Sequence, residues 1–223
     1  MRQLKDFYEE MRRCLKEAPL FVLYLDGLGY YMYEYAKREG RISAMEEKYR
    51  VEPAQSVFPP LTNPALATIL TGRMPGEHKI LNRSSHVLQV PTIFDEWKGN
   101  SAYLEGDSVI VRTNPLPKLH TAWKGQKGDE RIFHSALKEI DKGTYFIFVH
   151  FHGIDDAAHM GGPYSLDVLA EIKRKDEIAG VIAEHFPGQV LLISDHGLHE
   201  EGKGGDHGNT CHEDLTVIWG TKL

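Results

Sequence analysis

Three short apolar segments, each followed by acidic or imidazole side chains, constrain the fold more than any other feature of the sequence. The segments and the residues they lead into are 20–25 with Asp26, 145–149 with Asp155, and 190–193 with Asp195 and His196. Each segment is too short for a typical helix and contains no charged residue, which is typical of strands buried on both faces of a parallel sheet.

Helical patterns separate these strands along the chain. Apolar residues at helical spacing predict a helix over 2–18 that stops before Pro19. The other expected elements are helices over about 63–71, 129–141 and 167–186 and a last strand over 215–219. Strands that alternate with helices predict an α/β fold with a mostly parallel central sheet and helices on both faces. With no repeat or linker, we expect a single domain over 1–223, in which 98–128 is an irregular surface excursion near the site.

Charge and hydropathy argue against several classes of protein. The 223 residues include 26 Lys and Arg against 32 Asp and Glu, a formal charge of −6, which lacks the basic footprint of a sequence-independent nucleic-acid binder. No apolar run approaches the ~20 residues that a membrane span needs, and no secretory signal is visible at the N-terminus. Cys14 and Cys211 cannot build a disulfide framework, so we expect a cytoplasmic protein that does not act at a membrane.

The polar residues after the strands predict a metal centre. In open α/β sheets, ligands bind just beyond the carboxyl ends of the strands. One acidic residue there is often an ordinary cap of a turn or helix, but three strands that all end this way are harder to explain as caps. Carboxylates and imidazoles that converge at one sheet edge need a cation to offset their repulsion and desolvation. Such mixed oxygen and nitrogen ligands suit zinc, with manganese as the alternative.

Further candidate ligands lie close to these strand ends in the sequence. His159 follows Asp155 by four residues, so both can reach one metal, whereas the neighbouring Asp156 is expected behind the ligands or in solvent. Glycines flank the segment that carries His207 and permit a close backbone approach, while His212, after Cys211, remains its rival. Three other histidines are expected behind the ligands or at the surface: His150, His152 and His199.

The start of the helix at 63–71 supplies a candidate nucleophile. Pro64 is favoured in a first helical turn and Gly72 just past a helix end, which places Thr62 or Asn63 at or next to the N-cap. Both residue types are ordinary caps. However, a helix N-terminus also stabilises anions, and a hydroxyl bound to a divalent cation can attack phosphorus. Beside the metal ligands, we therefore expect Thr62 to be the nucleophile.

These pieces, in this order, resemble the alkaline phosphatase superfamily, and within it the type I phosphodiesterase/nucleotide pyrophosphatase group. The matching motifs are Leu25-Asp26-Gly27, Thr62 ahead of Thr71-Gly72, Asp155-Asp156-Ala157-Ala158-His159, Ser194-Asp195-His196-Gly197 and Gly205-Asp206-His207-Gly208. The segment 150–165 is also similar to the catalytic domain of phosphoethanolamine transferases of the glycolipid-anchor pathway. The resemblance covers about 21–220 and implies an alkaline phosphatase-like core that lacks a large cap domain.

The resemblance implies two divalent metal ions, zinc before manganese. By position, one would be held by Asp155, His159 and His207, and the other by Asp26, Asp195, His196 and the oxygen of Thr62. It also implies a phospho-Thr62 intermediate, an oxyanion donor in the backbone N–H of Asn63, and a phosphoryl contact from Asn82. Ala65 departs from the family, which often has Asn there. Without a cap, either a bulky substrate docks on an open site or a second subunit completes it, so a homodimer is possible.

The expected function is a two-metal phosphodiesterase that acts on a small phosphoester. The alternatives are a phosphonoacetate hydrolase-like enzyme that cleaves a C–P bond, a phosphomonoesterase and, in another class, a non-catalytic metal-binding interaction module. A sulfatase is disfavoured because its formylglycine arises from Cys or Ser, and Thr62 cannot give that aldehyde. A phosphoglycerate mutase of this superfamily would use a serine and a large inserted domain, and neither is evident.

Overall fold

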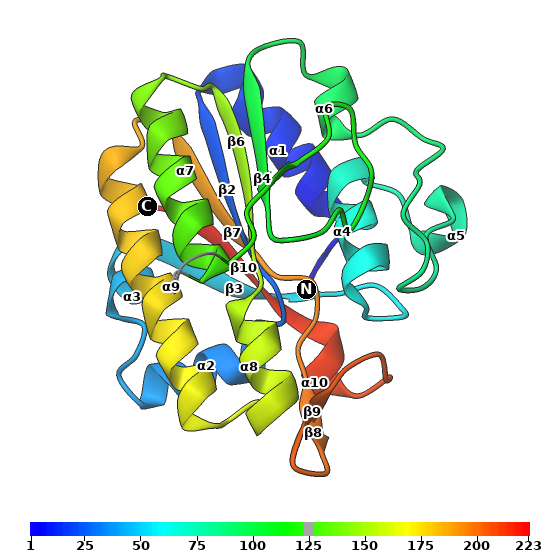
Figure 1. Cartoon of the computed structure of the whole chain (residues 1–223), viewed down its shortest axis with the longest axis vertical. Coiled ribbons are helices and arrows are strands. Elements are labelled where there is room, and N and C mark those ends of the chain that lie inside the picture. Colours follow the sequence, from blue (N-terminus) through cyan, green and yellow to red (C-terminus); the bar gives the residue numbers. More distant parts are fainter. Residues whose placement is uncertain (123–126) are drawn as a thin grey trace.

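The computed structural model describes residues 1–122 and 127–223 and contains an eight-stranded sheet in the order β1-β3-β10-β7-β2-β6-β4-β5 (Figure 1). Its strands are β1 Arg2–Gln3, β2 Leu20–Leu25, β3 Tyr49–Gln55, β4 Ser101–Glu105, β5 Lys118–Leu119, β6 Phe146–Phe151, β7 Gln189–Ile193 and β10 Thr216–Lys222. Strand β10 runs antiparallel to both of its neighbours, and every other pairing in the sheet is parallel. A separate hairpin is formed by β8 His199–Glu201 and β9 Gly204–Asp206.

Helices cover both faces of the sheet (Figure 1). Those that pack on one face are α1 Asp6–Glu17, α4 Thr62–Thr71 and α6 Ile93–Glu96. Those on the other face are α2 Tyr30–Arg38, α3 Ser43–Lys48, α7 Gly128–Asp141, α8 Gly153–Gly161 and α9 Leu166–His185. The short helices α5 Pro75–His78 and α10 His212–Leu215 lie in connections.

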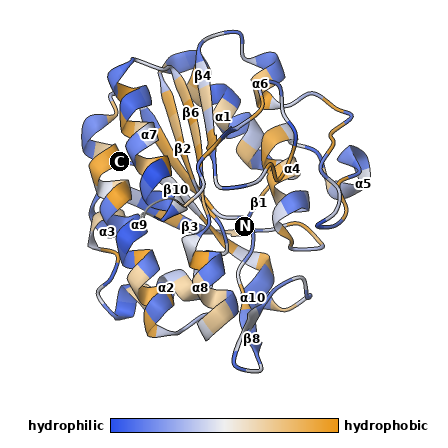
Figure 2. Ribbon diagram, in the orientation of Figure 1, coloured by the Kyte–Doolittle hydropathy of each residue, from blue (hydrophilic) through white to orange (hydrophobic). Residues whose placement is uncertain are grey.

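Strand β2 shows why this arrangement is stable. Its side chains alternate between the faces, so Val22 and Tyr24 pack with α1 and α4, while Phe21 and Leu23 pack with the helices of the other face. All six residues of the strand are buried, which explains its continuous apolar sequence. Figure 2 shows the same apolar colouring across the central strands and polar colouring on the outer surfaces of the helices.

The predicted α/β class is confirmed, and three of the differences lie at element ends. The N-terminal helix begins at Asp6 rather than residue 2, because Arg2 and Gln3 pair with β3 instead. Strand β6 extends to Phe151 and so takes His150 into the sheet. The last strand starts at Thr216 and is antiparallel.

Residues 98–128 do not form only a surface excursion, so that expectation was wrong for part of the segment. Strand β4 pairs with β6 inside the sheet, and β5 extends the sheet beside it. The last residue of β4, Glu105, is fully buried. Strand β4 ends in the charged Glu105 and lies in a segment with many Gly and Pro residues. The sequence therefore contained no apolar run from which this strand could be predicted. Positions 123–126 of this segment lie outside the described residues.

Within 1–122 and 127–223, no helix combines the length and apolarity required to cross a bilayer. Cys14 and Cys211 are both free thiols, and Cys14 is buried in the core.

Candidate active site

The carboxyl ends of β2, β6 and β7 meet at one edge of the sheet because these strands are parallel neighbours. Asp26 follows β2, Asp155 lies in the first turn of α8 after β6, and Asp195 follows β7. Gly27 permits the close approach of the first two: it has a φ of +72°, and a Cβ there would lie 2.9 Å from the Cβ of Asp155. The three acidic residues expected from the sequence therefore do converge.

One group of side chains surrounds the ring of His196. Its Nε2 lies 3.4 Å from Oδ1 of Asp26, 3.2 Å from Oδ2 of Asp195 and 3.2 Å from Oγ1 of Thr62. The ring and both carboxylates are buried. Asp26, Asp195 and His196 each direct one ligand atom to a common point, so they could hold a metal ion beside the Thr62 hydroxyl.

A second group forms around Asp155. His159 Nε2 lies 3.3 Å from Asp155 Oδ2, and His207 Nε2 lies 4.0 Å from Asp155 Oδ1. The Nδ1 atoms of the two rings lie 2.9 Å from the backbone carbonyls of Gly205 and Pro60, respectively. Each carbonyl accepts from the ring N–H, so a ring in its neutral form has its Nε2 lone pair on the side of Asp155. This orientation is that of histidines ready to bind a cation. The hydrogen bond to Asp155 raises the pKa of His159, so without a cation this ring tends to hold a second proton there.

The two groups are adjacent, and the geometry distinguishes the rival histidines. The rings of His196 and His207 stack with centroids 3.6 Å apart. His207 is buried next to Asp155, whereas His212 is exposed at the start of α10. Among the described residues, His212 belongs to no group able to hold a metal ion.

Three buried carboxylate oxygens at this edge have no hydrogen-bond partner: Oδ1 of Asp26, Oδ1 of Asp155 and Oδ2 of Asp195. A buried carboxylate oxygen without a hydrogen bond costs about 1–3 kcal/mol or more. Three such oxygens close together also repel one another, and only the single Nε2 of His196 lies near two of them. Cations remove both costs. The donor set of carboxylates and imidazoles therefore fits divalent metal ions such as zinc.

The charges of the site shift the pKa values of its residues. Burial and the Asp26 carboxylate raise the pKa of Asp195 to about 7. Burial lowers the pKa of His196, but the Asp195 and Asp26 carboxylates outweigh this effect and raise it to about 10. Burial and the neighbouring His196 lower the pKa of His207 to about 4, so that ring is neutral and its Nε2 carries a lone pair. The site thus gathers more negative charge than it can hold without protons or cations.

Thr62 is the first residue of α4, and Leu61 precedes the helix as its N-cap. The hydroxyl consequently lies at the positive end of the helix, beside His196. Asn63 is buried, and its Nδ2 donates to the carbonyls of Ser85 (3.1 Å) and Ile110 (3.0 Å). Its side chain thereby ties the helix start to two loops. Gly72 ends the helix in the left-handed conformation, as expected.

Asn82 lies apart from these groups. It is exposed, and its Oδ1 accepts hydrogen bonds from the backbone N–H and the hydroxyl of Ser84 and from the hydroxyl of Ser85. The neighbouring Arg83 reaches the site instead, with Nη2 2.8 Å from Nε2 of His207. No motif in the sequence pointed to Arg83, because a single arginine in a loop carries no signal of its own.

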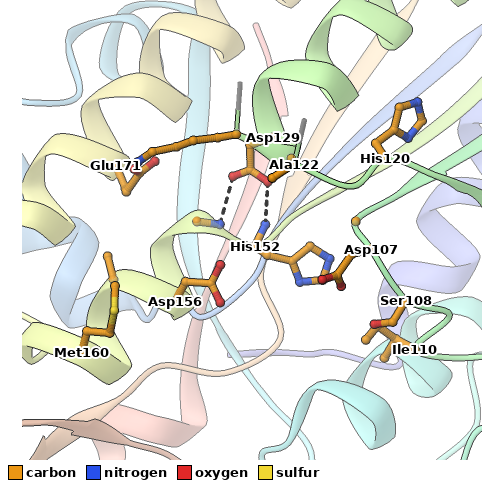
Figure 3. A pocket seen from close by; sticks show the side chains of 15 residues that line it. Asp107, Ser108, Ile110, His120, Ala122, Asp129, His152, Asp156, Met160 and Glu171 are labelled. Carbon is orange, nitrogen blue, oxygen red and sulfur yellow. Dashed lines mark hydrogen bonds and ion pairs between the residues drawn. The ribbon is translucent and has the colours of Figure 1, made fainter. Parts of the chain in front are cut away.

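A cavity of about 440 Å³ lies at the first turn of α8, and its lining includes no residue of the two groups (Figure 3). It is bounded by α7, α8 and the loop after β4, and His152 and Asp156 contribute to its wall. Asp156 is exposed there and is absent from the metal-capable groups of the described residues, which agrees with its expected place away from the ligands. Its carboxyl is still partly surrounded by protein, and this partial burial and the nearby carboxylates raise its pKa against the opposing effect of His152.

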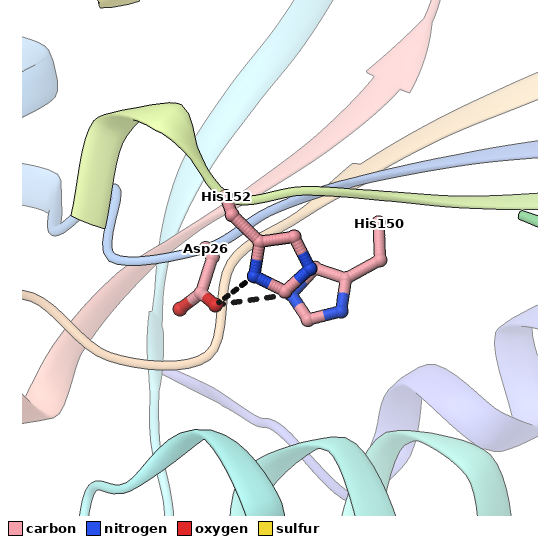
Figure 4. Close-up of side chains that lie close together, drawn as sticks. All are labelled: Asp26, His150 and His152. Atoms are coloured by element: carbon pink, nitrogen blue, oxygen red, sulfur yellow. Dashed lines mark hydrogen bonds and ion pairs between the residues drawn. The ribbon is translucent and has the colours of Figure 1, made fainter. Parts of the chain in front are cut away.

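His150 and His152, expected behind the ligands or at the surface, both lie against Asp26 (Figure 4), and sequence reasoning missed the buried Glu105 that joins them. His150 Nε2 and His152 Nδ1 lie 3.1 and 3.2 Å from Oδ2 of Asp26, and Glu105 faces the opposite nitrogens of both rings. Burial raises the pKa of Glu105, but the two histidines lower it to about 2. The spacing of the histidines was the available signal, because residues two apart at a strand end share one face.

Comparison with known proteins places the chain in a family. The family model of type I phosphodiesterase/nucleotide pyrophosphatase matches residues 20–112 and 90–221, which include all the residues of both groups. The chain belongs to this family. The resemblance inferred from the motifs is thereby confirmed.

Two curated proteins are similar in sequence to most of this chain. Ectonucleotide pyrophosphatase/phosphodiesterase family member 1 of Rattus norvegicus is 21% identical over 178 residues, 65% of this chain and 20% of that protein. The catalytic subunit of GPI ethanolamine phosphate transferase 2 of Homo sapiens is 23% identical over 186 residues, 74% of this chain and 18% of that protein. The chain thus spans about a fifth of the length of these relatives.

Solved structures share the fold. Phosphonoacetate hydrolase from Sinorhizobium meliloti 1021, in complex with phosphonoacetate, superposes with a TM-score of 0.64 at 17% identity, covering 83% of this chain and 57% of that one. A 2-O GAG sulfatase superposes with a TM-score of 0.70 at 15% identity, covering 92% of this chain and 64% of that one. The alkaline phosphatase-like core is therefore confirmed as the fold.

Proposed function

We propose that this chain is a metal-dependent phosphoryl hydrolase whose 1–223 segment forms one catalytic domain and acts as a phosphodiesterase on a small phosphoester. The observation that supports it best is the set of three buried carboxylate oxygens that lack a hydrogen bond, two of which lie around the same His196 nitrogen as the Thr62 hydroxyl. Membership of the phosphodiesterase family and the similarity to a curated pyrophosphatase/phosphodiesterase support the same reaction class.

In this proposal, two divalent cations, zinc or manganese, occupy the two groups. Asp26, Asp195, His196 and Thr62 would hold one. Asp155, His159 and His207, which the resemblance assigns to one metal and whose side chains lie together here, would hold the other. When bound, the cations neutralise the carboxylates, lower the pKa of a bound hydroxyl and stabilise the charge of an in-line displacement.

The chain's own residues then divide the work of a two-step reaction. The Thr62 oxygen attacks phosphorus and forms a phospho-Thr62 ester, while the bond to the leaving alcohol breaks and the alcohol takes a proton. Water later hydrolyses that ester and restores the hydroxyl. The N-terminus of α4, including the backbone N–H of Asn63, favours the phosphoryl oxygens by its orientation. Contact from Asn82 would require its side chain to leave Ser84 and Ser85.

A decisive experiment combines metal analysis with three substrates. We expect about two zinc or manganese ions in the Thr62 and Asp155 groups, and faster release of p-nitrophenol from bis-p-nitrophenyl phosphate than from p-nitrophenyl phosphate. Phosphonoacetate tests the C–P alternative. Preference for the monoester or for phosphonoacetate would reassign the substrate class, and a metal-loaded chain inert on all three would favour the non-catalytic module.

The nucleophile is tested by Thr62→Ala, which should lower turnover by about a thousand-fold or more while metal content largely survives. Thr71→Ala on the same helix is the matched control, because the Thr71 hydroxyl donates to the Ala67 carbonyl and accepts from the Arg73 backbone N–H, both at the far end of the helix from Thr62. Normal turnover by Thr62→Ala would exclude Thr62 as nucleophile.

A cytoplasmic location and a homodimer remain predictions. Cell fractionation would test the location, and light scattering would test the oligomeric state.

A further inference from the structure

Three side chains with metal-binding atoms meet where α10 lies beside the hairpin of β8 and β9 (Figure 1). His199 opens β8, Cys211 precedes α10, and Asp214 lies within that helix. Each side chain offers one ligand atom, and these atoms lie within 4.8 Å of one another. None of the three residues belongs to the Thr62 group or the Asp155 group, so they form a separate cluster.

Asp214 is the buried centre of this cluster. Its side chain is fully buried, and its Oδ1 lies 2.8 Å from Nδ1 of His199. Its Oδ2 accepts a hydrogen bond from the backbone N–H of Asn209 at 2.8 Å. Carboxylates that bind metals are themselves held by hydrogen bonds. One oxygen of Asp214 is therefore fixed by the backbone, while the other faces His199.

The side chain of Asn209 holds the His199 ring from its far side. Nδ2 of the amide lies 3.1 Å from Nε2 of His199 and donates to it, while Nδ1 of the ring donates to Asp214. A half-turn of the amide presents its oxygen instead, and the ring proton can then move to Nε2. The Nδ1 lone pair becomes free for a cation, and the opposite N–H has a hydrogen-bond acceptor, as metal-bound histidines almost always do.

Charge and donor type select the kind of cation. A Cys211 thiolate and the Asp214 carboxylate carry two negative charges, which one divalent cation neutralises while the imidazole stays neutral. Without a cation, burial and the Asp214 carboxylate raise the pKa of the Cys211 thiol against the opposing effect of the Asp214 backbone. Binding therefore releases the thiol proton to solvent. Sulfur, nitrogen and oxygen donors together suit zinc, whereas calcium and magnesium take oxygen ligands.

We propose that His199, Cys211 and Asp214 form a zinc site that closes the segment 199–214, with a fourth position open to solvent. His199 and Cys211 are both partly exposed, so an ion and a water molecule can reach the cluster. The ligands come from both ends of the segment that carries His207, so the bound ion holds the backbone on either side of that residue. The inference shares no ligand with the proposed function and does not depend on it.

The test uses cobalt(II), which replaces zinc and gives a charge-transfer band in the near ultraviolet when a thiolate binds it. The Thr62 and Asp155 groups contain no cysteine, so this band reports the new site alone. We expect the band in the cobalt-loaded wild type and its loss in Cys211→Ser. Cys14→Ala is the matched control, because Cys14 is buried in the core, and this variant should keep the band.

A second variant leaves all three ligands in place. Asn209→Ala removes the amide behind His199 but keeps the backbone N–H that holds Asp214. We expect it to weaken cobalt binding at this site by about ten-fold or more. An unchanged affinity, measured by titration of the band, would contradict the role given to the Nδ1 lone pair of His199.

A third readout uses the wild type alone, so the test survives if Cys211→Ser does not fold. Zinc should protect Cys211 from alkylation by iodoacetamide, and equal rates with and without zinc would overturn the site. A cobalt-loaded protein that hydrolyses the diester but lacks the band would overturn this inference and leave the proposed function intact. The band without turnover of any phosphoester would do the reverse.

Discussion

Arg83 places Nη2 of its guanidinium 2.8 Å from Nε2 of His207, the ring nitrogen that faces Asp155. Because the His207 ring is neutral there, the guanidinium donates a hydrogen bond to its lone pair. The same lone pair is the one proposed to bind a cation, and it cannot do both. Arg83 is more than half exposed (58%), so the side chain is free to withdraw when a cation arrives.

We therefore expect Arg83→Gln to strengthen zinc binding at the Asp155 group by several-fold, up to about ten-fold, since about 1.4 kcal/mol of competition would be removed. Isothermal titration of the metal-free protein measures the change. Arg73→Gln, an exposed arginine of the neighbouring loop, should leave the affinity as it is. Unchanged zinc affinity in Arg83→Gln would show that the guanidinium does not compete.

A buried lysine holds the start of α8 in position. Lys175 is 1% exposed, and its Nζ lies 2.8 Å from Asp129 and 3.2 Å from Glu171. Asp129 in turn accepts hydrogen bonds from the backbone N–H groups of His152 and Gly153. Lys175→Met would leave two buried carboxylates without this charge, and we expect it to lower the free energy of unfolding by about 3–5 kcal/mol.

The matched control lies two residues earlier on the same helix. Lys173 forms an ion pair with Glu177 at 3.7 Å, and both side chains are more than half exposed. Exposed pairs contribute about 0–1 kcal/mol, so Lys173→Met should be close to neutral. Urea unfolding of both variants measures the difference. A Lys175→Met protein as stable as Lys173→Met would mean that the carboxylates become protonated or hydrated at little cost.

Gly197 allows the segment after β7 to pass a neighbouring backbone. A Cβ at this position would lie 2.1 Å from the carbonyl oxygen of Glu213, far inside contact distance. Gly197→Ala must therefore displace the chain next to His196, and we expect a loss of about 2–4 kcal/mol in stability together with weaker metal binding. Gly76→Ala meets no atom within 4 Å and should be nearly neutral in a thermal melt. Equal melting temperatures would contradict the prediction.

His78 should make stability depend on pH. Burial lowers its pKa to about 4, against about 6.5 in the unfolded chain, and its Nδ1 accepts from the backbone N–H of Ile80 at 3.1 Å. Between these values the unfolded state binds more protons than the folded state. The stabilisation is thus full above pH 6.5 and is lost as pH falls toward 4, by up to about 3 kcal/mol.

The measurement is the free energy of unfolding from pH 7 to pH 4 in the wild type and in His78→Gln. Because glutamine does not titrate, we expect a shallower decline in the variant, while the other titrating groups contribute equally to both curves. Parallel curves would show that His78 keeps an ordinary pKa in the folded state.

Much of the frame of this protein could be predicted from local sequence. The apolar runs at 20–25 and 190–193 identified central strands, because strands buried on both faces leave no polar position. Pro64 and Gly72 marked the limits of α4, since each has a conformational preference that acts within a few residues. The family motifs identified the candidate site residues as well, because these residues lie next to the ends of those strands and of α4.

Tertiary structure alone decided how those residues face one another. Glu105 stands in a weak sequence pattern, yet pairing of β4 with β6 buries it against His150 and so creates the cluster behind Asp26. Arg83 is likewise ordinary in sequence, and only the fold of its loop brings it to His207, 124 residues away. The sequence by itself determined the elements and the residue types at their ends, because propensity and burial are local. Which oxygen or nitrogen meets which partner depends on distances between strands, and these arise only when the sheet is assembled.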